Sequence, residues 1–162
     1  MNLILDIETT GLNPLYDRIT CIGVMHEDDE EVTVFYGEDE KDLLERFWLY
    51  IEKYSTAKII GFNVYKFDIR FIQIRSMFHN IVGKCLKKNY IDLMYELSFY
   101  NKYTSGTLDD YLQLIGLEKN GNGLHAIELY NEGNWTDLVK YCKNDVLVTK
   151  ELYKRCVKAG VL

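Results

Sequence analysis

The sequence predicts an α/β protein with three layers, in which helices flank a central mixed sheet of five strands. Three observations support this class. Three strand-like apolar segments occupy the N-terminal quarter of the chain. The spacing of apolar residues then changes from a strand period to a helical period. Two further strands follow between helices, and the order β-β-β-α-β-α-β-α is typical of a sheet covered by helices.

The first three strands are expected at residues 2–8, 18–26 and 31–37. Residues 2–8 (NLILDIE) form an apolar run that becomes polar at its end, and the other two segments are rich in β-branched and aromatic residues. An acidic turn at residues 27–30 separates the second segment from the third, which indicates a hairpin. We therefore expect these strands to form an antiparallel meander.

The middle of the chain alternates between helix and strand. Apolar residues recur at helical spacing behind an acidic start at residues 39–54, which predicts a helix. Residues 57–62 (AKIIGF) form a short apolar strand. A second helix is expected at residues 68–78, and residues 89–94 (NYIDLM) supply the fifth strand.

The rest of the chain is expected to be helical. The helical patterns cover residues 93–101, 107–115, 124–132 and 135–158. Residues 119–123 (KNGNG) form the clearest loop, because Asn and Gly favour turns. The length of 162 residues suits one domain, which we expect to span residues 1–162.

The composition indicates a soluble, intracellular protein. Apolar residues make up 48% of the chain and charged residues 27%, as in ordinary globular domains. The N-terminal residues lack the basic region of a signal peptide. No apolar run reaches the roughly 18 residues that cross a bilayer. We expect a cytoplasmic protein with no membrane partner.

The cysteines have the spacing of neither a zinc site nor a disulfide framework: Cys21, Cys85, Cys142 and Cys156.

Asp6 and Glu8 are the first candidates for chemistry. They are two residues apart on a predicted strand, so both side chains project to the same face. Two carboxylates at such a short separation repel each other by about 1 kcal/mol or more. A divalent cation would remove this repulsion. Solvated acids at a strand end are the other interpretation of this pair taken alone.

Two later motifs carry further acids. Residues 61–68 (GFNVYKFD) lead from a strand into a helix, and Asp68 at the helix start could be an N-cap, a metal ligand or both. In the last helix, Tyr141 and Asp145 are four residues apart and share one face. Such a pair is common by chance, but as the third motif in this order it is far more specific.

Together these segments resemble the DEDD superfamily of 3′→5′ exonucleases, which has a ribonuclease H-like fold. Residues 6–12 (DIETTGL) are similar to the first exonuclease motif, residues 63–68 to the second, and residues 141–145 (YCKND) to the third. Tyr141 matches the DEDDy subclass, because the sister subclass has His where this chain has Lys140. Over the whole chain, the resemblance is greatest to the proofreading exonuclease domains of family-B DNA polymerases and their stand-alone relatives.

The resemblance implies two-metal-ion catalysis. Four carboxylates would hold two Mg²⁺ or Mn²⁺ ions: Asp6, Glu8, Asp68 and Asp145. Oxygen ligands favour these hard ions over zinc. Two ions roughly 3.5–4 Å apart would activate water and stabilise the leaving 3′ oxygen. Tyr141 would orient the attacking water. The expected reaction is release of nucleoside 5′-monophosphates from the 3′ end of single-stranded nucleic acid, with DNA favoured.

The resemblance also assigns residues that contact the substrate. They follow the first motif or belong to the second: Thr9, Thr10, Gly11, Leu12, Asn63 and Phe67. Leu12 would wedge against the terminal base and Phe67 would stack on its neighbour, with core packing as the alternative for both. The expected partners are 3′ ends of single-stranded DNA or RNA. A net charge of −6 is low for broad phosphate binding and leaves room for a protein partner that delivers the substrate.

Several other polar residues are expected to be structural. Asp92 follows a strand and should cap the next helix, and the pair Asp109-Asp110 should cap another. His26 and His79 show no spacing that suggests zinc. His125 borders the predicted loop, where a substrate contact is the alternative to a structural role.

Three other functions compete with a DNA exonuclease. An RNA-directed 3′→5′ exonuclease would use the same site. A catalytically silent nucleic-acid-binding subunit would keep the fold but lose acids, whereas all four acids are present here. An endonuclease on a ribonuclease H-like fold would share the acids but would give no reason for Tyr141.

Overall fold

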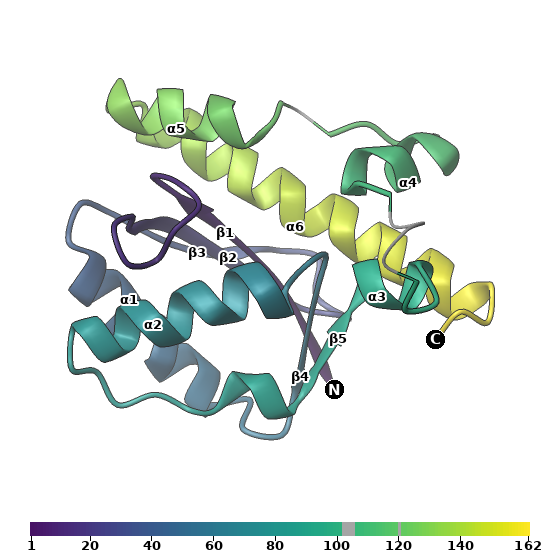
Figure 1. The fold of residues 1–162 in the computed structure, drawn as a ribbon, viewed down its shortest axis with the longest axis horizontal. Coiled ribbons are helices and arrows are strands. Elements are labelled where there is room, and N and C mark those ends of the chain that lie inside the picture. The colour runs from purple at the N-terminus through teal and green to yellow at the C-terminus, as the bar shows by residue number, and fades with distance from the viewer. Residues whose placement is uncertain (102–105, 120) are drawn as a thin grey trace.

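The computed structural model describes residues 1–101, 106–119 and 121–162 and confirms the predicted α/β class (Figure 1). Five strands form one mixed sheet in the order β3-β2-β1-β4-β5. Neighbouring strands are antiparallel among β1 (Asn2–Thr9), β2 (Ile19–His26) and β3 (Thr33–Tyr36). β4 (Lys58–Gly61) pairs in parallel with β1, and β5 (Tyr90–Asp92) pairs in parallel with β4.

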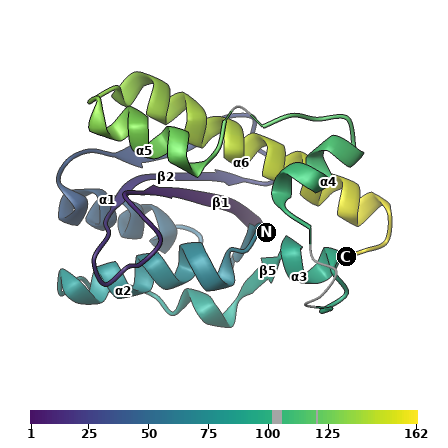
Figure 2. The same cartoon turned by 45° about the horizontal axis from the view of Figure 1, so that its top comes forward.

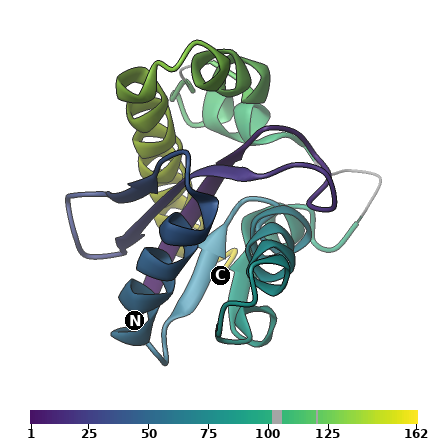
Figure 3. The same ribbon diagram turned by 90° about the vertical axis from the view of Figure 1, so that its left-hand side faces the viewer.

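Helices cover both faces of this sheet (Figure 3). α1 (Glu40–Glu52) and α2 (Arg70–Phe78) pack on one face, and the long α6 (Trp135–Lys158) packs on the other. α4 (Leu108–Leu114) and α5 (Gly123–Asn131) lie along α6 on the same side (Figure 2). Three short segments complete the described elements: the π-helix η1 (Tyr65–Ile69), the 3-10 turn η2 (Leu86–Lys88) and α3 (Leu93–Leu97).

The side chains of β1 alternate between the two helical layers. Leu3 and Leu5 belong to the apolar cluster that includes α1 and α2, whereas Ile4 belongs to the cluster that includes α6. Asp6 and Glu8 share the parity of Ile4, so their side chains face the layer of α6. The alternation thus turns both acids toward the helix that carries the third motif.

α6 approaches the sheet closely because residue 23 is glycine. Gly23 lies opposite Asp6 in the antiparallel register of β1 and β2. A Cβ atom on Gly23 would lie 2.7 Å from Val146 Cγ2 and 2.9 Å from Cys142 Sγ, both on α6. These distances are shorter than any that a real Cβ makes. The missing side chain therefore lets α6 settle against the polar end of β1.

Two helix boundaries differ from the sequence prediction by three residues or more. The helix expected at residues 68–78 begins earlier, as η1 at Tyr65, so Asp68 lies inside a helical turn rather than at its start. The helix expected at residues 93–101 ends at Leu97, because Phe99 and Tyr100 adopt positive φ angles of 50° and 59°. Of the loop predicted at residues 119–123, residue 120 lies outside the described residues and α5 already begins at residue 123.

Among the described residues, no helix has the length and apolar character needed to cross a membrane.

Candidate active site

The polar end of β1 opens into a pocket of about 430 Å³ that is bordered by η1, α5 and α6. The structure brings nearly all of the predicted site residues to its walls. They come from the three motifs: Asp6, Glu8, Thr9, Gly11, Leu12, Asn63, Phe67, Asp68, Tyr141 and Asp145. Residues that are distant in sequence therefore share one cavity.

Asp68 is fixed by the edge of β1 and does not cap a helix. Its Oδ1 atom accepts a hydrogen bond of 3.0 Å from the backbone N–H of Ile7. The pairing of β1 with β4 extends only to Ile4, so the N–H of Ile7 needs another acceptor on that edge. The N-cap role expected for Asp68 is wrong, because the helical turn begins three residues earlier.

Asp92 is a capping residue, as expected, and it also shapes the second motif. One of its oxygens accepts from the N–H of Met94 at the start of α3 and from the N–H of Asn63. The other accepts from the N–H of Tyr65. These bonds hold the chain at Asn63, whose φ of 57° is unusual for a residue other than glycine. Because backbone donors occupy both of its oxygens, Asp92 is not a candidate metal ligand.

Several buried oxygen atoms of the pocket lack partners. Among the described residues, Glu8 Oε1, Asp145 Oδ1 and the Tyr141 hydroxyl have no hydrogen-bond partner. A buried polar atom without a partner costs roughly 1–3 kcal/mol. Such oxygens fit the coordination of a hard divalent cation. The arrangement therefore suits Mg²⁺ or Mn²⁺ and a bound water.

The carboxylates of the pocket resist ionisation. Burial, and then the neighbouring Asp145, raise the pKa of Asp6 to about 8. Burial also raises the pKa values of Glu8 and Asp68, and in each the charge of Asp6 adds to the effect. Burial likewise raises the pKa of Asp145. The repulsion expected from two acids on one strand thus extends to four acids from three elements.

Lys119 is a candidate site residue that the sequence analysis missed. Its Nζ atom lies 2.7 Å from Asp145 Oδ2 and 5.4 Å from the centre of the Tyr141 ring. Burial lowers the pKa of Lys119, but the nearby Asp145 and Asp6 outweigh it and the pKa is raised overall. One signal could have found this residue, since it is the only Lys or Arg between Lys102 and Lys140.

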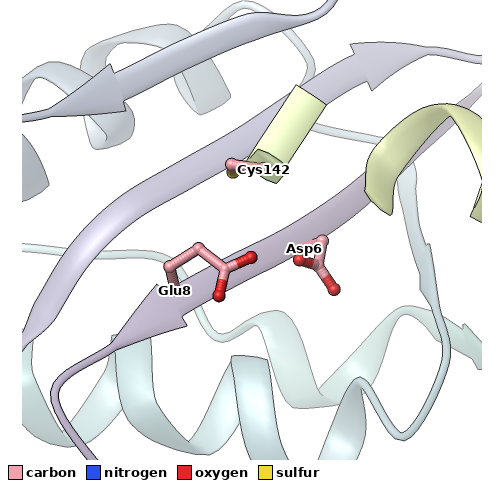
Figure 4. Close-up of side chains that lie close together, drawn as sticks. All are labelled: Asp6, Glu8 and Cys142. Atoms are coloured by element: carbon pink, nitrogen blue, oxygen red, sulfur yellow. The ribbon is translucent and has the colours of Figure 1, made fainter. Parts of the chain in front are cut away.

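Cys142 lies beside the first two acids (Figure 4). One oxygen from each of Asp6 and Glu8 and the Cys142 sulfur all lie within 4.8 Å of one another. A hydrogen bond with Cys21 and burial raise the pKa of Cys142 well above its usual value, so it remains a neutral thiol. A thiol is a poor ligand for Mg²⁺. Cys142 therefore belongs to the packing of α6 on β2 and not to the ligand set.

The loop after β1 forms one rim of the pocket. The side chain of Leu12 is 81% exposed, so core packing, the alternative for this residue, is wrong. A Cβ on Gly11 would lie 2.5 Å from the carboxylate of Asp17, which explains the glycine. Thr10 is the predicted contact that does not line the pocket. Its hydroxyl instead accepts from the N–H of Arg18 and closes the loop.

Other residues complete the walls of the pocket. Phe67 lines the pocket and also packs on Phe71 with ring centres 5.0 Å apart, so both of its interpretations apply. Leu124 of α5 faces the pocket and is 70% exposed, and the sequence analysis did not single it out. His125 does not line the pocket; its ring packs edge-on against that of Tyr141, 6.0 Å away.

Comparisons with known proteins agree with this architecture. Residues 3–157 match the family model of the RNase H superfamily. An uncharacterized protein of Methanocaldococcus jannaschii is 38% identical over 173 residues, covering 98% of this chain and 97% of that protein. The family B DNA polymerase of the archaeon Pyrobaculum calidifontis has a similar fold, with a TM-score of 0.80 and 19% identity over 98% of this chain. The chain spans about 25% of that polymerase's length.

Proposed function

The chain belongs to the RNase H superfamily, and from this premise we propose that it is a metal-dependent 3′→5′ exonuclease of the DEDDy type. Residues 1–162 would act as one exonuclease domain on single-stranded nucleic acid, with DNA favoured. One observation carries the proposal: four carboxylates and a tyrosine from β1, η1 and α6 surround an open pocket that contains unpartnered buried oxygens. The fold similarity to a family B DNA polymerase supports it.

Four residues would hold the metal ions: Asp6, Glu8, Asp68 and Asp145. When bound, two divalent ions would neutralise these acids, activate water and stabilise the leaving 3′ oxygen. Glu8 and Asp145 each offer a buried oxygen without a hydrogen-bond partner for this purpose. The hydrogen bond from the N–H of Ile7 would keep the Asp68 carboxylate in place at the edge of β1.

Tyr141 would orient the attacking water as a hydrogen-bond donor. Burial, and then the charge of Asp145, raise the pKa of Tyr141 above its usual value. The phenol therefore stays protonated at neutral pH and does not act as a general base. Lys119, which is paired with Asp145, would stabilise negative charge on the phosphate during the displacement.

Apolar residues on the two rims would position the end of the strand. Leu12 and Leu124 are both exposed at the pocket and would enclose the terminal base. Phe67 would support the neighbouring base by stacking, a contact that tolerates any sequence. The backbone at Thr9 and Gly11 would approach the terminal nucleotide.

Degradation of end-labelled oligonucleotides tests the proposal. We expect 5′-labelled single-stranded DNA to give a ladder that shortens from the 3′ end with Mg²⁺ or Mn²⁺, and a circular single strand to stay intact. RNA of the same sequence should be degraded more slowly. Asp145→Asn should abolish the ladder. First release of the 5′ nucleotide would contradict the polarity, and cleavage of the circle would indicate an endonuclease.

A metal titration separates an enzyme from a silent binding subunit. We expect the wild-type protein to bind Mn²⁺ in calorimetry and Asp6→Ala to lose most of this binding. The exposed α6 variant Lys143→Ala is the matched control and should bind as the wild type does. Equal binding by the wild type and Asp6→Ala would exclude the catalytic function.

A further inference from the structure

Positive charge is concentrated in one segment of the chain. Residues 53–91 contain eight Lys or Arg and one acid, Asp68, whereas the rest of the chain contains eleven Lys or Arg and twenty-four acids. The segment therefore carries a charge of +7 and the remainder −13, and the overall −6 conceals this difference. The segment includes β4, η1, α2 and η2, and among its described Lys and Arg residues only Arg75 forms an ion pair, with Glu40 of α1.

A second pocket lies within this basic segment. It has a volume of about 520 Å³, and every residue that lines it belongs to η1, α2 or η2. Lys66, Arg70 and Lys87 contribute three exposed cationic side chains, and none of the lining residues is acidic. Tyr65 and the half-buried Ile74 add apolar surface. We call this site the basic pocket.

The walls of the basic pocket are fixed by contacts between elements. The Gln73 side chain of α2 accepts a hydrogen bond from the N–H of Leu86, which holds η2 beside α2. Tyr65 stacks on Tyr90 of β5 with ring centres 4.7 Å apart and planes 11° apart. The pocket is therefore built by the fold and does not require a rearrangement to form.

Two of its three cations are free to bind a ligand. Lys66 lies over the ring of Tyr95, with 5.3 Å between Nζ and the ring centre. Among the described residues, Arg70 and Lys87 make neither an ion pair nor a side-chain hydrogen bond. Exposed cations around a concave surface attract phosphates. Because like charges repel, their clustering does not stabilise the fold. Their placement therefore favours an anionic ligand.

The basic pocket and the candidate active site lie on either side of the same helical turn. Asn63, Phe67 and Asp68 line the active site, whereas Tyr65 and Lys66 line the basic pocket. A helix with its side chains is roughly 10–12 Å across. A strand whose 3′ end occupies the active site can therefore reach the basic pocket by crossing η1.

We propose that the basic pocket binds the phosphodiester backbone of the single-stranded substrate, upstream of its 3′ end. This inference rests on the proposed function and adds a second binding site to it. Arg70, Lys87 and Lys66 would pair with successive phosphates, and the apolar surface would contact a base without reading its identity. The acidic remainder of the surface would repel other paths and direct the strand across η1.

Binding without catalysis tests the basic pocket. Fluorescence anisotropy in chelator and low salt would compare a labelled single-stranded DNA of about 15 nucleotides with a labelled trinucleotide. For the double variant Arg70→Ala/Lys87→Ala, we expect about ten-fold weaker binding of the long strand and a salt-dependence slope that is reduced by about 1.4. Binding of the trinucleotide should change less than about two-fold.

The matched control removes the same charge elsewhere. Lys154→Ala/Lys158→Ala, at exposed positions near the end of α6, should bind both strands as the wild type does. An equal loss in this control would mean that net charge alone matters and would overturn the inference. An equal loss for the long and the short strand would also overturn it, because the variant would then act at the active site.

The two proposals fail separately in this design. If the wild type binds the long strand through Arg70 and Lys87 but degrades no oligonucleotide, the basic pocket stands and the exonuclease proposal falls. If the wild type degrades DNA from the 3′ end and the double variant has the same kcat/KM as the wild type on both long and short strands, only the basic pocket falls. With both proposals correct, the variant loses kcat/KM on the long strand and keeps its kcat.

Discussion

At the scale of single residues, Tyr141 could be predicted as a site residue from the sequence, whereas Lys119 could not. Tyr141 is predictable because its distance of four residues from Asp145 is a local property of a helix. Lys119 reaches Asp145 across 26 positions of the chain, by way of a loop whose path the sequence pattern does not give. Both side chains nevertheless lie near the Asp145 carboxylate. A substitution of each gives a separate testable prediction.

Replacing Tyr141 by Phe should separate metal binding from turnover. The variant keeps the ring that packs on His125 but loses the hydroxyl that would orient water. We expect unchanged Mn²⁺ affinity in calorimetry and a single-turnover rate that is lower by about 10- to 100-fold. Tyr130→Phe, on α5 outside the pocket, is the control. A rate for Tyr141→Phe equal to that of the control would remove this tyrosine from the site.

Replacing Lys119 by Ala should move metal binding to higher pH. The charge of Lys119 lowers the pKa values of Asp6, Glu8 and Asp145. Without it, these acids hold their protons to higher pH, and protons compete with the metal. Calorimetry across pH should show half-maximal Mn²⁺ binding shifted upward in Lys119→Ala but not in Lys143→Ala. Overlapping profiles for the two variants would contradict this role.

At the scale of elements, the packing of α6 on β2 determines whether the third motif meets the first. Gly23 permits this contact, because an added Cβ would collide with Val146 and Cys142 of α6. An isolated glycine inside a strand gives only a weak sequence signal. The register that places it opposite Asp6 is a property of the paired strands.

Gly23→Val should therefore reduce stability and activity together. An inserted side chain under α6 costs about 1–3 kcal/mol of the free energy of unfolding through overpacking. The same displacement would move Tyr141 and Asp145 away from β1, so the exonuclease rate should fall more than the folded fraction. Leu147→Ala, at an exposed position on α6, should change neither. Full activity in folded Gly23→Val would show that the glycine is not needed for the site.

At the scale of the whole molecule, the buried acids make the folding stability depend on pH and on metal binding. The folded-state pKa of Asp6 is about 8, against roughly 3.9 in an unfolded chain. Between these values the metal-free folded state binds more protons than the unfolded state, so its stability falls as pH rises. Glu40 behaves in the opposite way. Burial raises its pKa, but hydrogen bonds, including those from Arg75 and His79, outweigh burial and lower the pKa overall. The contribution of Glu40 to stability is therefore lost only in more acidic solution.

Thermal unfolding should reveal this dependence. In chelator, we expect Tm to fall from pH 5.5 to pH 8, because the pocket acids lose the protons that the folded state holds. With saturating Mn²⁺ the trend should reverse, since the metal binds the deprotonated site. Asp6→Asn should show a flatter profile in chelator. A metal-free Tm that rises over this range would contradict the raised pKa values.

The sequence by itself determined the local geometry of the fold and of the candidate site. The alternating apolar residues of β1 define which face carries Asp6 and Glu8, and the helical period places Tyr141 and Asp145 on one face. Strand and helix periods are properties of the backbone, so they can be read from short segments. The order of these segments was enough to predict the mixed sheet, whereas the resemblance to the exonuclease motifs supplied the residues expected to meet in its pocket.

Only the tertiary structure decided the contacts between segments that are distant along the chain. Asp68 bonds to the free edge of β1, Lys119 pairs with Asp145, and Thr10 turns away from the pocket toward Arg18. The basic pocket likewise requires η2 to lie beside α2. Such contacts depend on where strands stop pairing and how loops close, and these follow from the packing of the whole chain rather than from any local period.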